Sequence, residues 1–149
     1  MRIQVSIVSL FIVLIIAFNL IFSFHQIRGN SMNTALNNGD MMVCYNRQVF
    51  NLLKNRMGTL RDRVVVLRVN GRFTVKRCVG LPGDTLIFSL ENNTDTFTVP
   101  RGKVFVLGDN IFNSTDSRLL GPIDLDSIYS VPVFVCNSLI GEMRNETDN

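Results

Sequence analysis

The sequence contains one histidine, His25, so the usual general base for a serine nucleophile is nearly absent. A Ser-His-Asp triad would need His25 itself, and a site with several histidine ligands to a metal is excluded. A neutral lysine can replace histidine as the base. The pKa of a free lysine is near 10.4, and burial lowers it by up to about 3–5 units. The base must therefore be a lysine on an apolar strand.

Of the three lysines, Lys76 meets this requirement, because it lies inside the apolar run 73–79. Lys54 lies in a polar stretch, and Lys103 follows a turn. Side chains alternate along a strand, so Lys76 and Arg77 point to opposite faces. Arginine does not release its proton, which makes Lys76 the candidate base. Two ordinary strand cations, one on each face, are the alternative.

Ser31 is the candidate nucleophile, in the segment Gly29-Asn30-Ser31-Met32. A glycine two residues before the serine, Gly29, lets backbone and substrate approach closely. A backbone N–H near the serine could meet a developing oxyanion. A loop serine in a Gly/Asn-rich turn is the alternative reading of the same residues.

Residues 108–118 form a dense cluster of polar side chains after an apolar strand. Asp116 and Arg118 can pair bidentately and fix a loop. Ser114 could present its hydroxyl to a neighbouring lysine. An elaborate surface turn would have the same composition.

Residues 3–24 are predicted to form a transmembrane anchor, preceded by a short tail at 1–2. The segment is uncharged and apolar all round, and about 22 residues match a hydrocarbon core of about 30 Å. A cleaved signal peptide has a shorter apolar region and small residues at its cleavage site, which this segment lacks. The flanking charges decide its orientation only weakly.

Residues 25–149 are predicted to form one mostly β domain, a curled antiparallel sheet or partial barrel. Alternating or β-branched runs separated by turn residues predict the strands. The strongest local prediction is a hairpin with the two-residue turn Asn70-Gly71. The segment 46–56 is left open between a short helix and an irregular insertion. The predicted strands are 41–45, 63–69, 72–79, 85–90, 96–99, 104–107 and 128–136.

Composition excludes several classes of protein. The net charge of +3 is mild and no Lys/Arg run is present, so nucleic acid is not an expected partner. Charged residues are 18% and apolar residues 46%, which excludes a disordered chain. Cys44, Cys78 and Cys136 lack CxxC spacing, and we expect small buried side chains rather than a disulfide framework.

Three segments together resemble the type I signal peptidase family, whose members are membrane-anchored endopeptidases with a Ser-Lys dyad. The serine box of that family, close to S-M-x-P-T-L, is matched by residues 31–36. The lysine box K-R-x-x-G-x-P-G-D is matched at every fixed position by 76–84. The box G-D-N-x-x-x-S-x-D-S-R-x-x-G is matched by 108–121. Gly29 fits the form of the family seen in Gram-positive bacteria.

The resemblance implies a role for each matching residue. Ser31 would be the nucleophile, Lys76 the base and Ser114 the hydroxyl that orients the lysine. The Ser31 N–H, helped by the Gly29 position, would line the oxyanion hole, and Met32 would contact substrate. The residues implied to support the site are Asp109, Asn110, Asp116 and Arg118.

The resemblance also implies the substrate and the location. The substrates would be signal-peptide-bearing precursors, cut after a small-x-small motif such as A-x-A, with no metal or organic cofactor. The β domain would lie on the extracytoplasmic face of the cell membrane, with the N-terminus in the cytoplasm.

The sequence departs from the family at two places and leaves alternatives open. Thr34 and Ala35 replace the usual Pro and Thr of the serine box, and 60–63 lacks the usual G-D turn. A signal-peptidase-like assembly factor that binds precursors, for example in pilus assembly, or a peptidase dedicated to a few substrates, is the main alternative. A membrane-tethered β domain with an unrelated binding role is the other.

Overall fold

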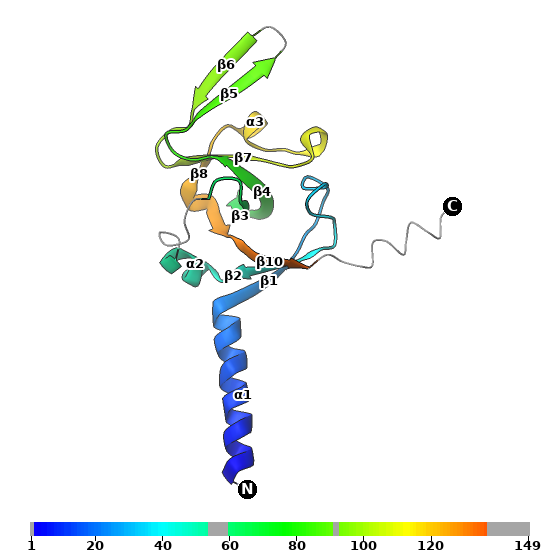
Figure 1. Cartoon of the computed structure of the whole chain (residues 1–149), viewed down its shortest axis with the longest axis vertical. Helices are drawn as coiled ribbons and strands as arrows, with labels where there is room; N and C mark the ends of the chain where they lie inside the picture. Colours follow the sequence, from blue (N-terminus) through cyan, green and yellow to red (C-terminus); the bar gives the residue numbers. More distant parts are fainter. Residues whose placement is uncertain (1, 54–59, 91–92, 137–149) are drawn as a thin grey trace, which may run out of the picture.

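The structure is a computed structural model that describes residues 2–53, 60–90 and 93–136 (Figure 1). An N-terminal helix, α1 (Arg2–Ile21), projects as a rod from a body made largely of antiparallel strands. All strand pairs in this part of the chain are antiparallel, which confirms the predicted mostly β class.

The strands form three sheets. The first has the order β1-β2-β10 and contains β1 (Phe22–Gln26), β2 (Met41–Tyr45) and β10 (Pro132–Cys136). The second has the order β8-β7-β4-β3-β9 and contains β8 (Ile123–Asp124), β7 (Lys103–Leu107), β4 (Arg72–Gly80), β3 (Val64–Val69) and β9 (Ile128–Ser130). The third is the hairpin of β5 (Thr85–Leu90) and β6 (Asn93–Thr98).

The hairpin of β3 and β4 is the predicted one, with Val69 opposite Arg72 and the turn at Asn70-Gly71. Both turn residues have positive φ, 50° and 76°, as a two-residue hairpin turn requires. One face of this hairpin packs into a buried cluster that includes Val65 from β3. The hairpin is therefore the element that fixes the position of the strand carrying Lys76.

Short helices complete the body. Residues 46–56, left open by the sequence, contain α2 (Arg47–Leu53), whose Phe50 is buried in the core. A 3-10 turn, η1 (Ile111–Asn113), and α3 (Ser117–Leu120) follow β7, and η2 (Leu125–Ser127) precedes β9.

The N-terminal helix ends at Ile21, three residues before the predicted end of the anchor at 24. Residues 22–26 instead form β1, paired with β2 from Phe22 opposite Tyr45 to Gln26 opposite Met41. The sequence did not reveal this strand because its aromatic side chains continue the apolar composition of the helix. Along α1 most described side chains from Ile7 onward are exposed apolar groups.

Within the described part of the chain, no helix combines the length and the apolar character needed to cross a bilayer. The membrane span predicted for 3–24 is therefore unconfirmed.

The predicted strand 128–136 is divided in two. β9 pairs with β3, β10 pairs with β2, and the pairing of β10 shifts between Pro132 and Phe134. Proline has no N–H to donate to a sheet, which explains the interruption. The two-residue strand β8 was not predicted, because it is too short to show a pattern.

The cysteine prediction holds for two of the three residues. Cys44 and Cys78 are buried in the two core clusters, and burial raises the pKa of each thiol to about 11. Cys136 is exposed, and none of the three cysteines, all of them within the described residues, forms a disulfide.

Candidate active site

Lys76 lies on β4 opposite Val65 of β3 and is only 4% exposed. Burial lowers the pKa of its ammonium, Asp116 opposes this shift, and the charge of Arg118 adds to it. No hydrogen bond to the amine is formed by the described residues. A buried amine without a bound carboxylate is easier to deprotonate than a surface lysine. This is the environment that the sequence required of a lysine base.

Arg77, the next residue, occupies the opposite face of β4 and has a carboxylate partner. Its Nε and Nη2 donate to the two carboxylate oxygens of Asp109 at 2.8 and 2.6 Å, and its Nη1 donates to the Asp62 carbonyl. The hydrogen bond to Asp109 raises the pKa of Arg77. The pair ties β4 to the start of the loop after β7.

Asp116 organises the loop between β7 and α3. Its side chain accepts hydrogen bonds from the Arg118 guanidinium at 2.9 and 2.7 Å, as the sequence predicted, and from the Gly108 N–H at 2.9 Å. Burial alone would raise the pKa of Asp116, but these hydrogen bonds hold it well below its usual range. The neighbouring Ser117 hydroxyl accepts from the Val106 N–H, which fixes the loop to β7.

Gly108 lies where the loop that carries Ser31 (the serine loop) contacts residues 108–121, the last of the three family boxes (the last box). A Cβ added to Gly108 would lie 2.1 Å from the Ser114 Oγ and 2.6 Å from the Ser31 carbonyl oxygen. Only a residue without a side chain fits between the two serines without displacing one of them. The Gly108 N–H also binds Asp116, whose charge acts on the pKa of Lys76, so the segment that contacts both serines lies within electrostatic range of Lys76.

Asn110 holds the serine loop against the last box. Its N–H donates to the Ser31 carbonyl at 3.0 Å, and its side-chain amide donates to the Asn30 carbonyl at 3.1 Å. The Gly29 N–H donates to the Asn38 side chain at 3.1 Å and is thus already engaged. The Ser31 N–H has no hydrogen-bond acceptor within the described residues. Of the two predicted oxyanion donors, Ser31 is therefore the one whose N–H is not used in the fold.

The Ser114 hydroxyl is buried, makes no hydrogen bond of standard geometry within the described part of the protein, and lies close enough to Asp116 to lower the pKa of that carboxyl. Met32, the predicted substrate contact, is 1% exposed and belongs to a core cluster with Ile27 and Met42.

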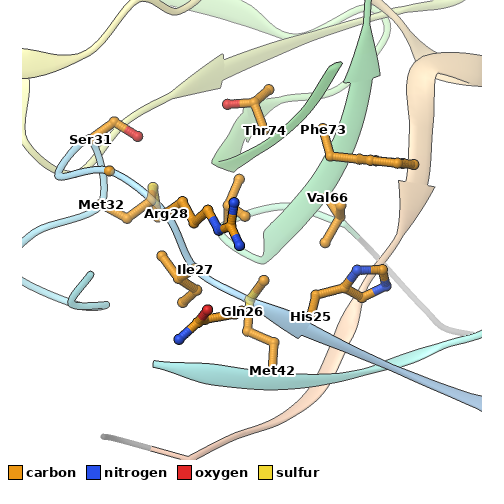
Figure 2. Close-up of a pocket in the computed structure, with 12 residues that line it drawn as sticks. His25, Gln26, Ile27, Arg28, Ser31, Met32, Met42, Val66, Phe73 and Thr74 are labelled. Atoms are coloured by element: carbon orange, nitrogen blue, oxygen red, sulfur yellow. The ribbon is translucent and has the colours of Figure 1, made fainter. Parts of the chain in front are cut away.

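A groove of about 280 Å³ extends from Ser31 toward β1 (Figure 2). The Ser31 loop and β1 form one wall, and residues 73–75 of β4 form the other. Met32, Met42 and Val66 are the buried side chains beneath it. Figure 2 shows Ser31 and Thr74 toward one end and His25 toward the other. Thr74, at the Ser31 end of the groove, points to the same side of β4 as Lys76.

Thr34, which replaces the usual proline of the serine box, has a φ of 156°. Proline is restricted to a φ near −65° and could not adopt this conformation. The departure from the family motif therefore falls where the backbone has a conformation that proline could not adopt.

Three features of the site escaped the sequence analysis. The Arg77–Asp109 pair was not predicted, although both residues stand in matched boxes. The need for glycine at 108 comes from a contact between segments far apart in the chain. The groove residues His25, Arg28 and Phe73 carry no motif, so no sequence signal could have indicated them.

Comparison with known proteins gives the family. The family model described as "Signal peptidase, peptidase S26" matches residues 1–92 and 85–136. The chain therefore belongs to the signal peptidase family S26, which is a family of peptidases. This confirms the resemblance found in the serine, lysine and last boxes.

Relatives occur in bacteria and in mitochondria. The chain is 36% identical to a mitochondrial ATP-independent inner membrane protease subunit 1a of Arabidopsis thaliana, over 80% of this chain and 74% of the relative. It is 31% identical to signal peptidase IB of Staphylococcus aureus, over 83% and 82%. A solved signal peptidase I from Enterococcus faecalis is 26% identical, with a TM-score of 0.43 over 49% of this chain and 95% of that one.

Proposed function

We propose that this protein is a membrane-anchored serine endopeptidase that removes signal peptides with Ser31 as nucleophile and Lys76 as general base. The observation that carries the proposal is the burial of Lys76, at 4% exposure, beside the loops that bring Ser31 and Ser114 together. At a solvated position the amine would stay protonated near neutral pH and could not accept a proton.

The proposed reaction has two stages. Ser31 Oγ attacks the carbonyl of the bond to be cut, and the neutral Lys76 amine takes the hydroxyl proton. The ammonium then gives this proton to the leaving amine, and an acyl-enzyme forms on Ser31. Lys76 next deprotonates a water molecule that hydrolyses the ester and frees Ser31. The Ser31 N–H stabilises the oxyanion in both stages.

Supporting roles follow from the contacts. The Ser114 hydroxyl, which is buried beside Asp116, orients the Lys76 amine. Asp116 and Arg118 shape the loop that holds Ser114, while Asp109 anchors it to β4 through Arg77. Asn110 fixes the carbonyl side of Ser31, which leaves the N–H side free for substrate.

The groove is suited to an extended peptide. β1 is at the edge of its sheet. β4 pairs with β7 only from Arg77 onward, so among the described strands the part of β4 before Arg77 has β3 as its one neighbour. A peptide strand between these two edges can form main-chain hydrogen bonds on both sides. The buried floor leaves little depth for side chains, which favours a small-x-small motif such as A-x-A.

The anchor and the location complete the proposal. Of the predicted anchor 3–24, the helical part up to Ile21 would cross the cell membrane once, with the N-terminus cytoplasmic and 25–149 on the extracytoplasmic face, while residues 22–24 belong to β1. The uncharged sequence and the exposed apolar side chains along α1 support a lipid environment. Since β1 follows directly after α1, the groove would lie close to the membrane surface where a precursor's signal helix emerges.

The test is cleavage of an A-x-A precursor by the purified chain in detergent, with the cut located by mass spectrometry. We expect Ser31→Ala and Lys76→Ala to abolish cleavage. The matched controls are Ser127→Ala and Lys103→Ala, which alter a serine and a lysine outside the site and should retain it. Full activity in either Ser31→Ala or Lys76→Ala would refute the dyad. Tight precursor binding by the unaltered chain without any cut would instead favour an assembly factor.

A further inference from the structure

The backbone around Ile27 determines which residues of the groove wall meet a bound peptide. The Ile27 N–H donates to the Asp40 carbonyl at 2.8 Å, and the Ile27 carbonyl accepts from the Gly39 N–H at 2.9 Å. Backbone groups of successive strand residues point to opposite sides. The N–H and carbonyl of Arg28 therefore face the open edge, where a substrate strand would pair.

Side chains along this wall alternate between the floor and the rim of the groove. Ile27 is 3% exposed and packs in the core cluster with Met32 and Met42, whereas Arg28 is exposed. Residues opposite each other on paired strands place their side chains on the same face. Substrate residues above the buried floor must be small, and the residues between them lie on the face of Arg28.

Arg28 is a cation in a groove wall to which the described part of the chain contributes no acidic side chain. Among the described residues, the lining contains no Asp or Glu, and its other ionisable member is His25. The side chain of Arg28 extends over the groove (Figure 2). It forms no ion pair or hydrogen bond with any described residue. Asp40, the carboxylate on the paired segment, is 1% exposed and accepts from the Asn37 N–H.

We propose that Arg28 is a specificity-determining residue that favours precursors with a carboxylate side chain at the x of the small-x-small motif or at the residue just before the motif. This inference rests on the proposed function, because it assumes that the groove holds the precursor on the N-terminal side of the cut. An aspartate at either position lies on the rim side with Arg28, and its charge is complementary to the guanidinium.

The experiment compares peptides that differ only by Asp or Asn at each of the two positions. For the unaltered chain in detergent, we expect kcat/KM to be about three- to fivefold higher for Asp at one or both positions, the size of a partly exposed ion pair. The ratio should fall to about 1 in Arg28→Gln and should invert in Arg28→Glu. Arg101→Gln, which removes an arginine from a turn outside the groove, should keep the ratio of the unaltered chain.

Binding separates this inference from the cleavage reaction. Fluorescence anisotropy with the Ser31→Ala variant should show the same Asp preference, weakened at about 1 M salt by screening. A chain that cleaves Asn and Asp peptides equally, or an Arg28→Gln variant that keeps the preference, overturns the inference and leaves the proposed peptidase intact. An Asp preference in binding with no cleavage by the unaltered chain supports the groove and refutes the proposed function.

Discussion

The two faces of β4 carry neighbouring cations in opposite environments. Lys76 is buried, has no hydrogen bond from the described residues, and has a lowered pKa. Arg77 is partly exposed, makes a bidentate ion pair with Asp109, and has a raised pKa. One face destabilises a positive charge and the other stabilises it. A single strand thus carries both the proposed proton acceptor and a structural cross-link, which is possible because its side chains alternate.

The largest expected effect comes from changing the cation on each face. Lys76→Arg should lower kcat/KM on an A-x-A reporter by at least about 10³-fold, because a guanidinium cannot accept the serine proton. Arg77→Lys keeps the charge and loses the bidentate geometry, so it should reduce stability while folded protein retains activity within about tenfold. Steady-state kinetics on folded protein tests both. An active Lys76→Arg variant would show that the cation on the buried face need not lose its proton, which would refute the role of Lys76 as the base.

The next effect tests the contact between the two loops beside Lys76. Gly108→Ala places a Cβ 2.1 Å from the Ser114 Oγ and 2.6 Å from the Ser31 carbonyl oxygen. We expect a loss of about 1–3 kcal/mol in the free energy of unfolding, from overpacking, and about 100-fold in kcat/KM, from displacement of the serines. Denaturant unfolding and kinetics measure the two.

Gly102→Ala is the control for this substitution. Its φ of 75° is unfavourable for alanine, but the added Cβ meets no atom within 4 Å. It should lose about 1 kcal/mol of stability and keep its kcat/KM. Equal activity of the Gly108 and Gly102 variants would show that the contact at Gly108 does not position the site.

A smaller effect concerns the stabilised charges. The pKa of Asp116 is depressed in the folded protein, and the unfolded value is near 3.9. Its contribution to stability is fully present above about pH 4 and is lost as pH falls toward the folded pKa. Asp116→Asn should cost about 3 kcal/mol at pH 7 and should flatten the loss of stability between about pH 4 and pH 2.

The matched control is Asp124→Asn, which removes the carboxylate of the exposed Lys103 pair. It should change the free energy of unfolding by less than about 1 kcal/mol. Urea unfolding across the pH range measures both variants. A pH dependence in Asp116→Asn as steep as that of the unaltered chain would assign the acid sensitivity to another carboxylate.

Local patterns predicted much of this molecule. Alternation and the Asn70-Gly71 turn predicted the hairpin of β3 and β4, and the elimination of Lys54 and Lys103 selected Lys76. The Asp116–Arg118 pair was predictable because its partners are two residues apart.

Contacts between distant segments were not predictable from the same patterns. Gly108 separates Ser31 from Ser114, and Arg77 meets Asp109 across 32 positions in the chain. β1 was hidden because Phe22 and Phe24 continue the apolar run of the helix. Burial of Lys76 could be expected from its strand, but the missing hydrogen bond at Ser114 depends on the packed loop.

The pH dependence of kcat/KM for the unaltered chain tests the central claim most directly, with a reporter slow enough for chemistry to limit the rate. The general base must be neutral, so the rate should rise with pH along a limb set by the pKa of Lys76, which lies below the ordinary lysine value. A rate that falls on acidification through this limb supports a buried lysine base. A flat profile from about pH 6 to pH 9 would contradict it.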